Sequence, residues 1–209
     1  YQGRYAFNNQ PNIALWNLTA LAHALSPLVE RDDLQDTLQR FESILSRQYS
    51  ELMRSKLGLT ESHAGDSALF SDLFSLLEQG AVDYSLFFRQ LSDVDSKPQL
   101  EVIELSARRT SLQSWFERYL ARCTQERDSA GLPISTEHRC KRMRAVNPKY
   151  VLRNYLAQQA IEKAELGDYS EVECLATLLA DPFAEHVQYD DYSHSPPAWG
   201  KEREISCSS

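Results

Sequence analysis

The sequence predicts an all-α fold, with a bundle-like body of about seven to nine helices over residues 1–182 and an extended tail over residues 183–209. Three observations lead to this prediction. Apolar residues recur at three- and four-residue steps along most of the chain. Capping residues, glycine and proline lie at the ends of those stretches. Leucine occurs 28 times, against 14 valines and isoleucines together, and this bias favours helix over strand.

The first predicted helix begins after Asn12 and carries one apolar face. The side chain of Asn12 suits an N-cap, and Pro11 favours extended geometry at Gln10, so we expect no earlier start. A break is expected near Ser26-Pro27. The apolar spacing indicates a helix of the hydrophobic core. The apolar residues are Ile13, Trp16, Leu18, Leu21, Ala22, Leu25 and Leu28.

A long second helix is predicted to begin at Asp32 or Asp33, either of which can cap it. Its acidic residues lie early and its basic residues, Arg54 and Lys56, lie late, which suits the helix macrodipole. Gly58 is a natural residue to follow the last turn. We expect the first two helices to form an antiparallel hairpin.

Two shorter helices rich in phenylalanine follow a polar connection. Asp66 is expected to cap the first helix, which ends at Gly80, and Asp83 is expected to cap the second. We interpret their phenylalanine side chains as part of the core, and we predict a further helix over residues 99–107.

The helix predicted over residues 111–127 has two distinct faces. Its polar residues, Arg122 among them, lie largely opposite the apolar ones. A loop with glycine and proline follows, and then a short basic helix or turn over residues 135–144. The apolar face consists of Leu112, Trp115, Phe116, Tyr119, Leu120 and Cys123.

Two more helices are predicted before the tail. Asn147 ends the preceding helix, and Pro148 is expected at the first position of the next, where its missing N–H costs nothing. Gly167 ends that helix. Ser170 and Glu173 have the spacing of a capping box at the start of the last helix, which an Asp-Pro pair closes.

The tail has no period, and a pair of prolines opposes helix within it. We expect Trp199 and Ile205 to anchor it to the helical body.

Composition excludes several classes of protein. The net charge of −8 disfavours a general nucleic-acid binder, which needs a positive surface. No apolar run approaches the roughly 20 residues that span a bilayer, so no membrane partner is expected. The four cysteines are widely spaced, which favours a reducing compartment, and we expect a cytoplasmic protein.

Nucleotide-binding motifs are absent from the sequence. No two of the seven glycines lie close enough to form a loop that cradles phosphate. The chain also has no V-A-I-K, H-R-D or D-F-G motif of a protein kinase, and no Ser or Cys lies in a nucleophile elbow. We therefore expect these residues alone to contain no catalytic, cofactor-binding or metal-binding site.

Two clusters have competing interpretations. A basic cluster has two interpretations. It could bind phosphate or an acidic partner, or, more simply, it is a solvated helix face that pairs with acidic residues of the chain. Cys123, His138 and Cys140 suggest zinc, but a fourth ligand at suitable spacing is missing. The basic cluster consists of Arg139, Lys141, Arg142 and Arg144, with Lys149 and Arg153 nearby.

Three ordered segments carry a family resemblance. They resemble the selenoprotein O family of kinase-like protein adenylyltransferases, and the resemblance extends from Tyr1 to Ser209, with residues 60–140 the least distinctive. The first segment holds Gly3-Arg4-Tyr5, Asn9-Gln10-Pro11 and Leu15-Trp16-Asn17-Leu18; the second runs from Asn147 to Tyr155; the third holds Trp199-Gly200-Lys201 and Ser206-Cys207-Ser208-Ser209.

The resemblance implies the C-terminal part of a kinase-like fold. Such proteins transfer AMP from ATP to Ser, Thr or Tyr hydroxyls of protein substrates, with Mg or Mn neutralising the phosphates. The family's nucleotide site lies before the segment that begins here, and the chain opens without Met. We therefore expect a piece of a longer bacterial protein that binds no nucleotide itself, acts as a scaffold, and has the missing kinase-like part as its partner.

Cys207 is the one candidate functional residue, as a redox switch. Its position near a polar chain end favours thiol exchange, provided that thiolate forms; the alternative is an idle terminal thiol. The resemblance implies that this position, selenocysteine in some members, can pair with a cysteine of the kinase-like activation segment. That segment would lie before Tyr1.

Two other functions remain open. The chain could be an independent helical interaction module without catalytic activity, in which case its surface should be polar. A detached piece should instead expose apolar side chains around Ile13, Trp16 and the phenylalanine-rich helices. A third, weaker possibility is a redox or metal protein built on its cysteines.

Overall fold

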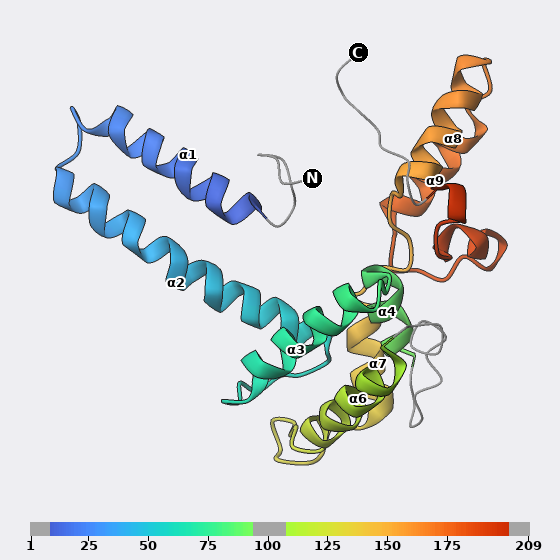
Figure 1. The fold of residues 1–209 in the computed structure, drawn as a ribbon, viewed down its shortest axis with the longest axis horizontal. Coiled ribbons are helices and arrows are strands. Elements are labelled where there is room, and N and C mark those ends of the chain that lie inside the picture. The colour runs from blue at the N-terminus through green and yellow to red at the C-terminus, as the bar shows by residue number, and fades with distance from the viewer. Residues whose placement is uncertain (1–8, 94–107, 201–209) are drawn as a thin grey trace. The chain divides into compact units, whose positions relative to one another are not determined.

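A computed structural model of the chain describes residues 9–93 and 108–200, and every regular element in these ranges is a helix (Figure 1). The all-α prediction is therefore confirmed. The chain divides into two compact units, Tyr1–Met53 and Arg54–Ser209. In the described ranges, no helix has both the length and the hydropathy that spanning a bilayer requires. The helix predicted over residues 99–107 lies outside these ranges, as do Ile205 and Cys207.

The first unit contains α1 (Gln10–Leu25) and most of α2 (Arg31–Lys56), which run in opposite directions on either side of a turn (Figure 1). The predicted cap at Asn12 is wrong, because α1 begins earlier, with Asn9 at the N-cap position. Pro11 lies in the first turn, where a missing N–H costs no hydrogen bond. The side chain of Asn12 instead donates to that of Asn9, at 3.2 Å.

α1 is not a buried core helix within the described residues. No side chain of α1 is buried, and Trp16 and Leu21 are 57% and 54% exposed. Apolar side chains of α2, such as Ile44 and Leu52, are exposed as well. The apolar surface expected around Trp16 is therefore present, whereas Phe70, Phe87 and Phe88 of the later helices are buried.

The end of α2 follows the sequence prediction closely. Gly58 has a φ of +70°, a conformation that glycine adopts at little cost. The Leu59 N–H donates to the Arg54 carbonyl at 2.8 Å, and the Gly58 N–H donates to the Ser55 carbonyl at 3.0 Å. This pair of bonds forms a Schellman motif. At the other end the predicted cap is wrong by two or three residues, because α2 begins at Arg31 and both aspartates lie in its first turn.

The core of the second unit is formed by α3 (Asp66–Gln79), α4 (Tyr84–Leu91), α6 (Arg109–Cys123) and α7 (Thr136–Arg144). Trp115 of α6 is fully buried and its indole N–H donates to the Leu69 carbonyl of α3 at 2.9 Å. Its ring stacks on that of Tyr119, with centroids 5.4 Å apart. The predicted apolar face of α6 therefore packs into the core, as expected.

Helix boundaries in this core agree in part with the sequence. Asp83 caps α4 by accepting from the Leu86 N–H, and Ser135 caps α7 by accepting from the His138 N–H. The prediction for α3 is off by one residue, because Gly65 takes the N-cap position and Asp66 lies inside the first turn. α6 ends at Cys123, four residues earlier than predicted.

The second unit continues with α8 (Asn154–Glu165), α9 (Ser170–Ala180), and the 3₁₀ helices η2 (Val187–Ser193) and η3 (Ala198–Gly200). The prediction that a helix starts at Pro148 is wrong. Residues 148–153 form no helix, because the N–H groups of Lys149 and Tyr150 both donate to the Pro182 carbonyl, at 2.8 and 3.1 Å. The tail is less extended than predicted, since it contains η2 and η3.

Gly167 ends α8 as predicted, with a φ of +84° and a second Schellman motif. The predicted capping box of α9 is absent, because Tyr169 occupies the N-cap position without a side-chain bond. Trp199 anchors the C-terminal segment as expected: its ring meets that of Tyr155 edge-on, with centroids 5.8 Å apart. Gly200 is buried against Tyr155, where an added Cβ would lie 2.9 Å from the Tyr155 Cβ.

Candidate functional site

Cys207, the candidate redox residue, lies outside the described residues, so the candidate site is built from the described signature segment, residues 147–155. Asn147 begins this segment and is completely buried. Its amide donates to the Lys56 carbonyl at 2.8 Å and to the Ser92 hydroxyl at 3.0 Å. Asn147 therefore joins the end of α2 to the end of α4.

Arg89, on α4, contacts the same segment. This buried arginine donates to the Asn147 carbonyl at 3.1 Å and forms an ion pair with Glu185. Its role was not predicted, because a single arginine in a short helix is usually a surface residue. Arg89 thus links α4, the signature segment and the segment after α9.

Lys149 holds the C-terminal segment through two carboxylates. Its ammonium lies 2.7 Å from Glu185 and 2.6 Å from Asp190. Burial alone would lower the pKa of Lys149, but the two carboxylates outweigh it and raise that pKa to about 12. The adjacent Tyr150 hydroxyl donates to the His186 carbonyl at 3.1 Å. The segment is therefore tied to residues 182–190 by side chains and backbone together.

Arg153 completes the set by pairing with Asp83, the N-cap of α4, at 2.5 Å. Burial alone would raise the pKa of Asp83, but the bonds from Arg153 and from the Leu86 N–H prevail and lower it. The polar residues of the signature segment thus serve to hold secondary-structure elements together. None of these contacts requires a ligand.

The basic cluster agrees only in part with the simpler of its two interpretations. Arg144 pairs with Asp93 at 2.6 Å, and Lys149 and Arg153 have the acidic partners given above. Arg139 is buried, and Arg142 donates to the Gly58 carbonyl at 3.4 Å. Arg142, Arg144, Lys149 and Arg153 therefore contact other parts of the fold.

The cysteines offer no metal site in the described part of the chain. No group of three or more His, Cys, Asp or Glu side chains there is arranged to hold a metal. Cys123 and Cys140 are buried thiols and Cys174 is a half-buried one, and none of the three forms a disulfide. Burial raises the pKa of the Cys123 thiol, which makes it a poor nucleophile at neutral pH.

A buried ion network connects α3 and α6. Arg122, predicted on the polar face of α6, is buried and lies 2.8 Å from Asp66 and 2.6 Å from Glu126. Glu126 also accepts from the Thr60 N–H, at 2.6 Å. Burial would raise the pKa of Glu126, but the bonds from Thr60 and Arg122 outweigh it and lower that pKa. The network is internally paired and leaves no group for catalysis.

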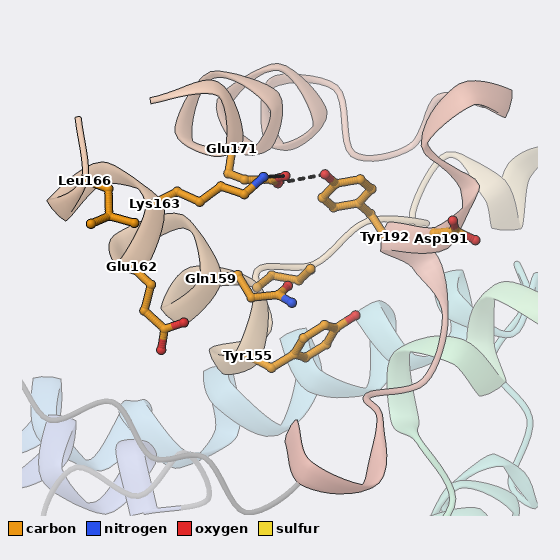
Figure 2. A pocket seen from close by; sticks show the side chains of 9 residues that line it. Tyr155, Gln159, Glu162, Lys163, Leu166, Glu171, Asp191 and Tyr192 are labelled. Carbon is orange, nitrogen blue, oxygen red and sulfur yellow. Dashed lines mark hydrogen bonds and ion pairs between the residues drawn. The ribbon is translucent and has the colours of Figure 1, made fainter. Parts of the chain in front are cut away.

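A pocket of about 570 Å³ lies between α8, α9 and η2 (Figure 2). Glu171 lines it from α9: one carboxylate oxygen lies 2.8 Å from the Lys163 ammonium, and the other accepts from the Tyr192 hydroxyl at 2.7 Å. The hydrogen bonds from Lys163 and Tyr192 lower the pKa of Glu171, so it is ionised at neutral pH. The lining consists of Tyr155, Leu156, Gln159, Glu162, Lys163, Leu166, Glu171, Asp191 and Tyr192.

Comparison with known proteins identifies the family. The family model described as Protein adenylyltransferase SelO matches residues 1–180. A Vibrio parahaemolyticus relative named Protein nucleotidyltransferase YdiU is 57% identical over 209 residues, which is 100% of this chain and 43% of that protein. Relatives of the same name in Vibrio vulnificus and Aliivibrio salmonicida are 54% and 53% identical over the whole chain, which is 43% and 42% of their own lengths.

The chain thus spans less than half the length of these relatives. The match confirms the resemblance that the three sequence segments indicated. Because the family model covers most of the chain and the relatives align with all of it, the chain belongs to the family of Protein adenylyltransferase SelO.

Proposed function

We propose that this chain is the C-terminal helical region of a protein adenylyltransferase, which transfers AMP from ATP to Ser, Thr or Tyr hydroxyls of protein substrates. The observation that carries the proposal is the family match over residues 1–180, together with relatives named as nucleotidyltransferases. The proposed protein is bacterial and cytoplasmic, and the three described cysteines, none of which forms a disulfide, fit a reducing compartment.

The proposed role of the chain is that of a scaffold. ATP and Mg or Mn would bind to a kinase-like part of the protein outside these 209 residues, because the sequence has no glycine-rich phosphate loop. The contacts of Asn147, Lys149 and Arg153 favour this role, since each joins separate elements. The kinase-like part is thus the expected partner of the chain.

Cys207 is proposed as a redox switch in the tail. Its thiol and a second thiol of the kinase-like part would be oxidised to a disulfide, with two electrons and two protons passing to an external disulfide such as oxidised glutathione. The contact between Trp199 and Tyr155 supports this role, because it holds the tail against α8 at a position close in sequence to Cys207.

The test uses the natural protein that contains this chain, incubated with Mg and with ATP labelled at its α-phosphate. Label retained on protein hydroxyls, and lost when ATP is labelled only at its γ-phosphate, is the expected result. Transfer of the γ-phosphate, or of no label at all, would overturn the proposal; the second outcome would favour an independent helical interaction module. A Cys207→Ser variant should lose any dependence of the rate on the glutathione redox ratio.

A further inference from the structure

The pocket between α8, α9 and η2 is a site that the proposed function does not use. Glu171 fixes the ring of Tyr192 on one side of it, and Tyr155 contributes a second ring (Figure 2). Tyr155 and Leu156 belong to a small hydrophobic cluster with Ala160, against which Tyr192 packs. The pocket therefore has an aromatic and aliphatic lining whose geometry is held before any ligand arrives.

The charge of the lining selects the class of ligand. Among the described residues that form it, Lys163 is the one cation, and Glu171 already pairs with it at 2.8 Å. Glu162 and Asp191 add two more carboxylates at its edges, and the Asp191 side chain is 99% exposed. The lining thus has an excess of two negative charges and no uncommitted cation, which disfavours a phosphate or a carboxylate.

We propose that this pocket binds an arginine side chain presented by a peptide segment of another protein. A guanidinium is planar and stays charged; it stacks on tyrosine rings and pairs with carboxylates. Its aliphatic stem suits contact with Leu156. The proposal does not depend on adenylyl transfer, because binding requires only α8, α9 and η2.

The test measures binding by fluorescence anisotropy, with the natural protein that contains this chain. The probe is a dye-labelled, capped hexapeptide with one arginine between two leucines, and its partner probe carries citrulline, the neutral isostere, in place of arginine. The arginine probe is expected to bind at least fivefold more tightly than the citrulline probe. Equal binding of the two probes, or no saturable binding, would overturn the proposal.

Two charge-matched variants locate the binding site. Glu162→Gln combined with Asp191→Asn removes both edge carboxylates, and should weaken binding of the arginine probe by about fivefold to tenfold, as expected for two exposed ion pairs. Glu78→Gln combined with Glu117→Gln removes two exposed carboxylates elsewhere and should leave the affinity unchanged. If both double variants weaken binding equally, the probe responds to net charge alone and the pocket assignment is wrong.

Discussion

Replacing Gly58 by alanine should destabilise the protein by two separable effects. Gly58 has a φ of +70°, and an added Cβ would lie 2.4 Å from the Cγ of Arg139 and 2.8 Å from the Sδ of Met143. Both neighbours are buried on α7, so neither can move aside freely. The positive φ costs about 1 kcal/mol, and the overpacking adds about 1–3 kcal/mol.

Gly167 provides the matched control. It ends α8 with the same Schellman motif and a φ of +84°, but an added Cβ would meet nothing within 4 Å. Gly167→Ala should therefore lower the free energy of unfolding only through the strained positive φ, by about 1 kcal/mol. The free energy of unfolding from urea titration measures both variants. A Gly58→Ala protein no less stable than Gly167→Ala would refute the close packing of α7 against the end of α2.

Three further perturbations test the polar contacts. Arg122→Met should lower the free energy of unfolding by about 3–5 kcal/mol, because it leaves the Asp66 and Glu126 carboxylates buried without their partner; a loss below 1 kcal/mol in urea titration would contradict this. Folding raises the pKa of Lys149 from its ordinary value of 10.5 to about 12, so the protonated ammonium stabilises the folded state. This contribution is complete below pH 10.5 and should be lost as the pH rises through about 12. Thermal melts from pH 9 to 12 should show a smaller decline in Lys149→Met than in the parent protein. Asp83→Ala should cost about 1–2 kcal/mol through the lost helix cap, whereas Asp83→Asn should retain much of the cap.

Local chemistry in the sequence predicted much of the fold. Asp83 was recognisable as a cap, and Gly58 and Gly167 as helix ends, because these roles depend on a few neighbouring residues. The buried face of α6 followed from apolar spacing alone, as Trp115 illustrates.

Several of the failures share a physical cause, which is contact between residues distant in sequence, whereas the misplaced caps at Asn12 and Asp66 are local errors of one to three residues. Residues 148–153 were predicted to begin a helix, but two of their N–H groups donate to the Pro182 carbonyl. Arg122 was predicted on the polar face of α6, because the spacing of residues along one helix does not show that Asp66 of α3 is its partner. The pocket around Glu171 was likewise unpredictable, since α8, α9 and η2 build it together.

The Pro182 carbonyl accepts two hydrogen bonds, and this affects how α8 and α9 can change in evolution. That one oxygen joins the two ends of the α8–α9 hairpin, since Tyr150 precedes α8 and Pro182 follows α9. Insertions or deletions at the far tip, near Gly167, would alter the reach of the hairpin without shifting the residues on either side of its base. Relatives of this chain should therefore tolerate changes in length at that tip, while the spacing on both flanks stays constant.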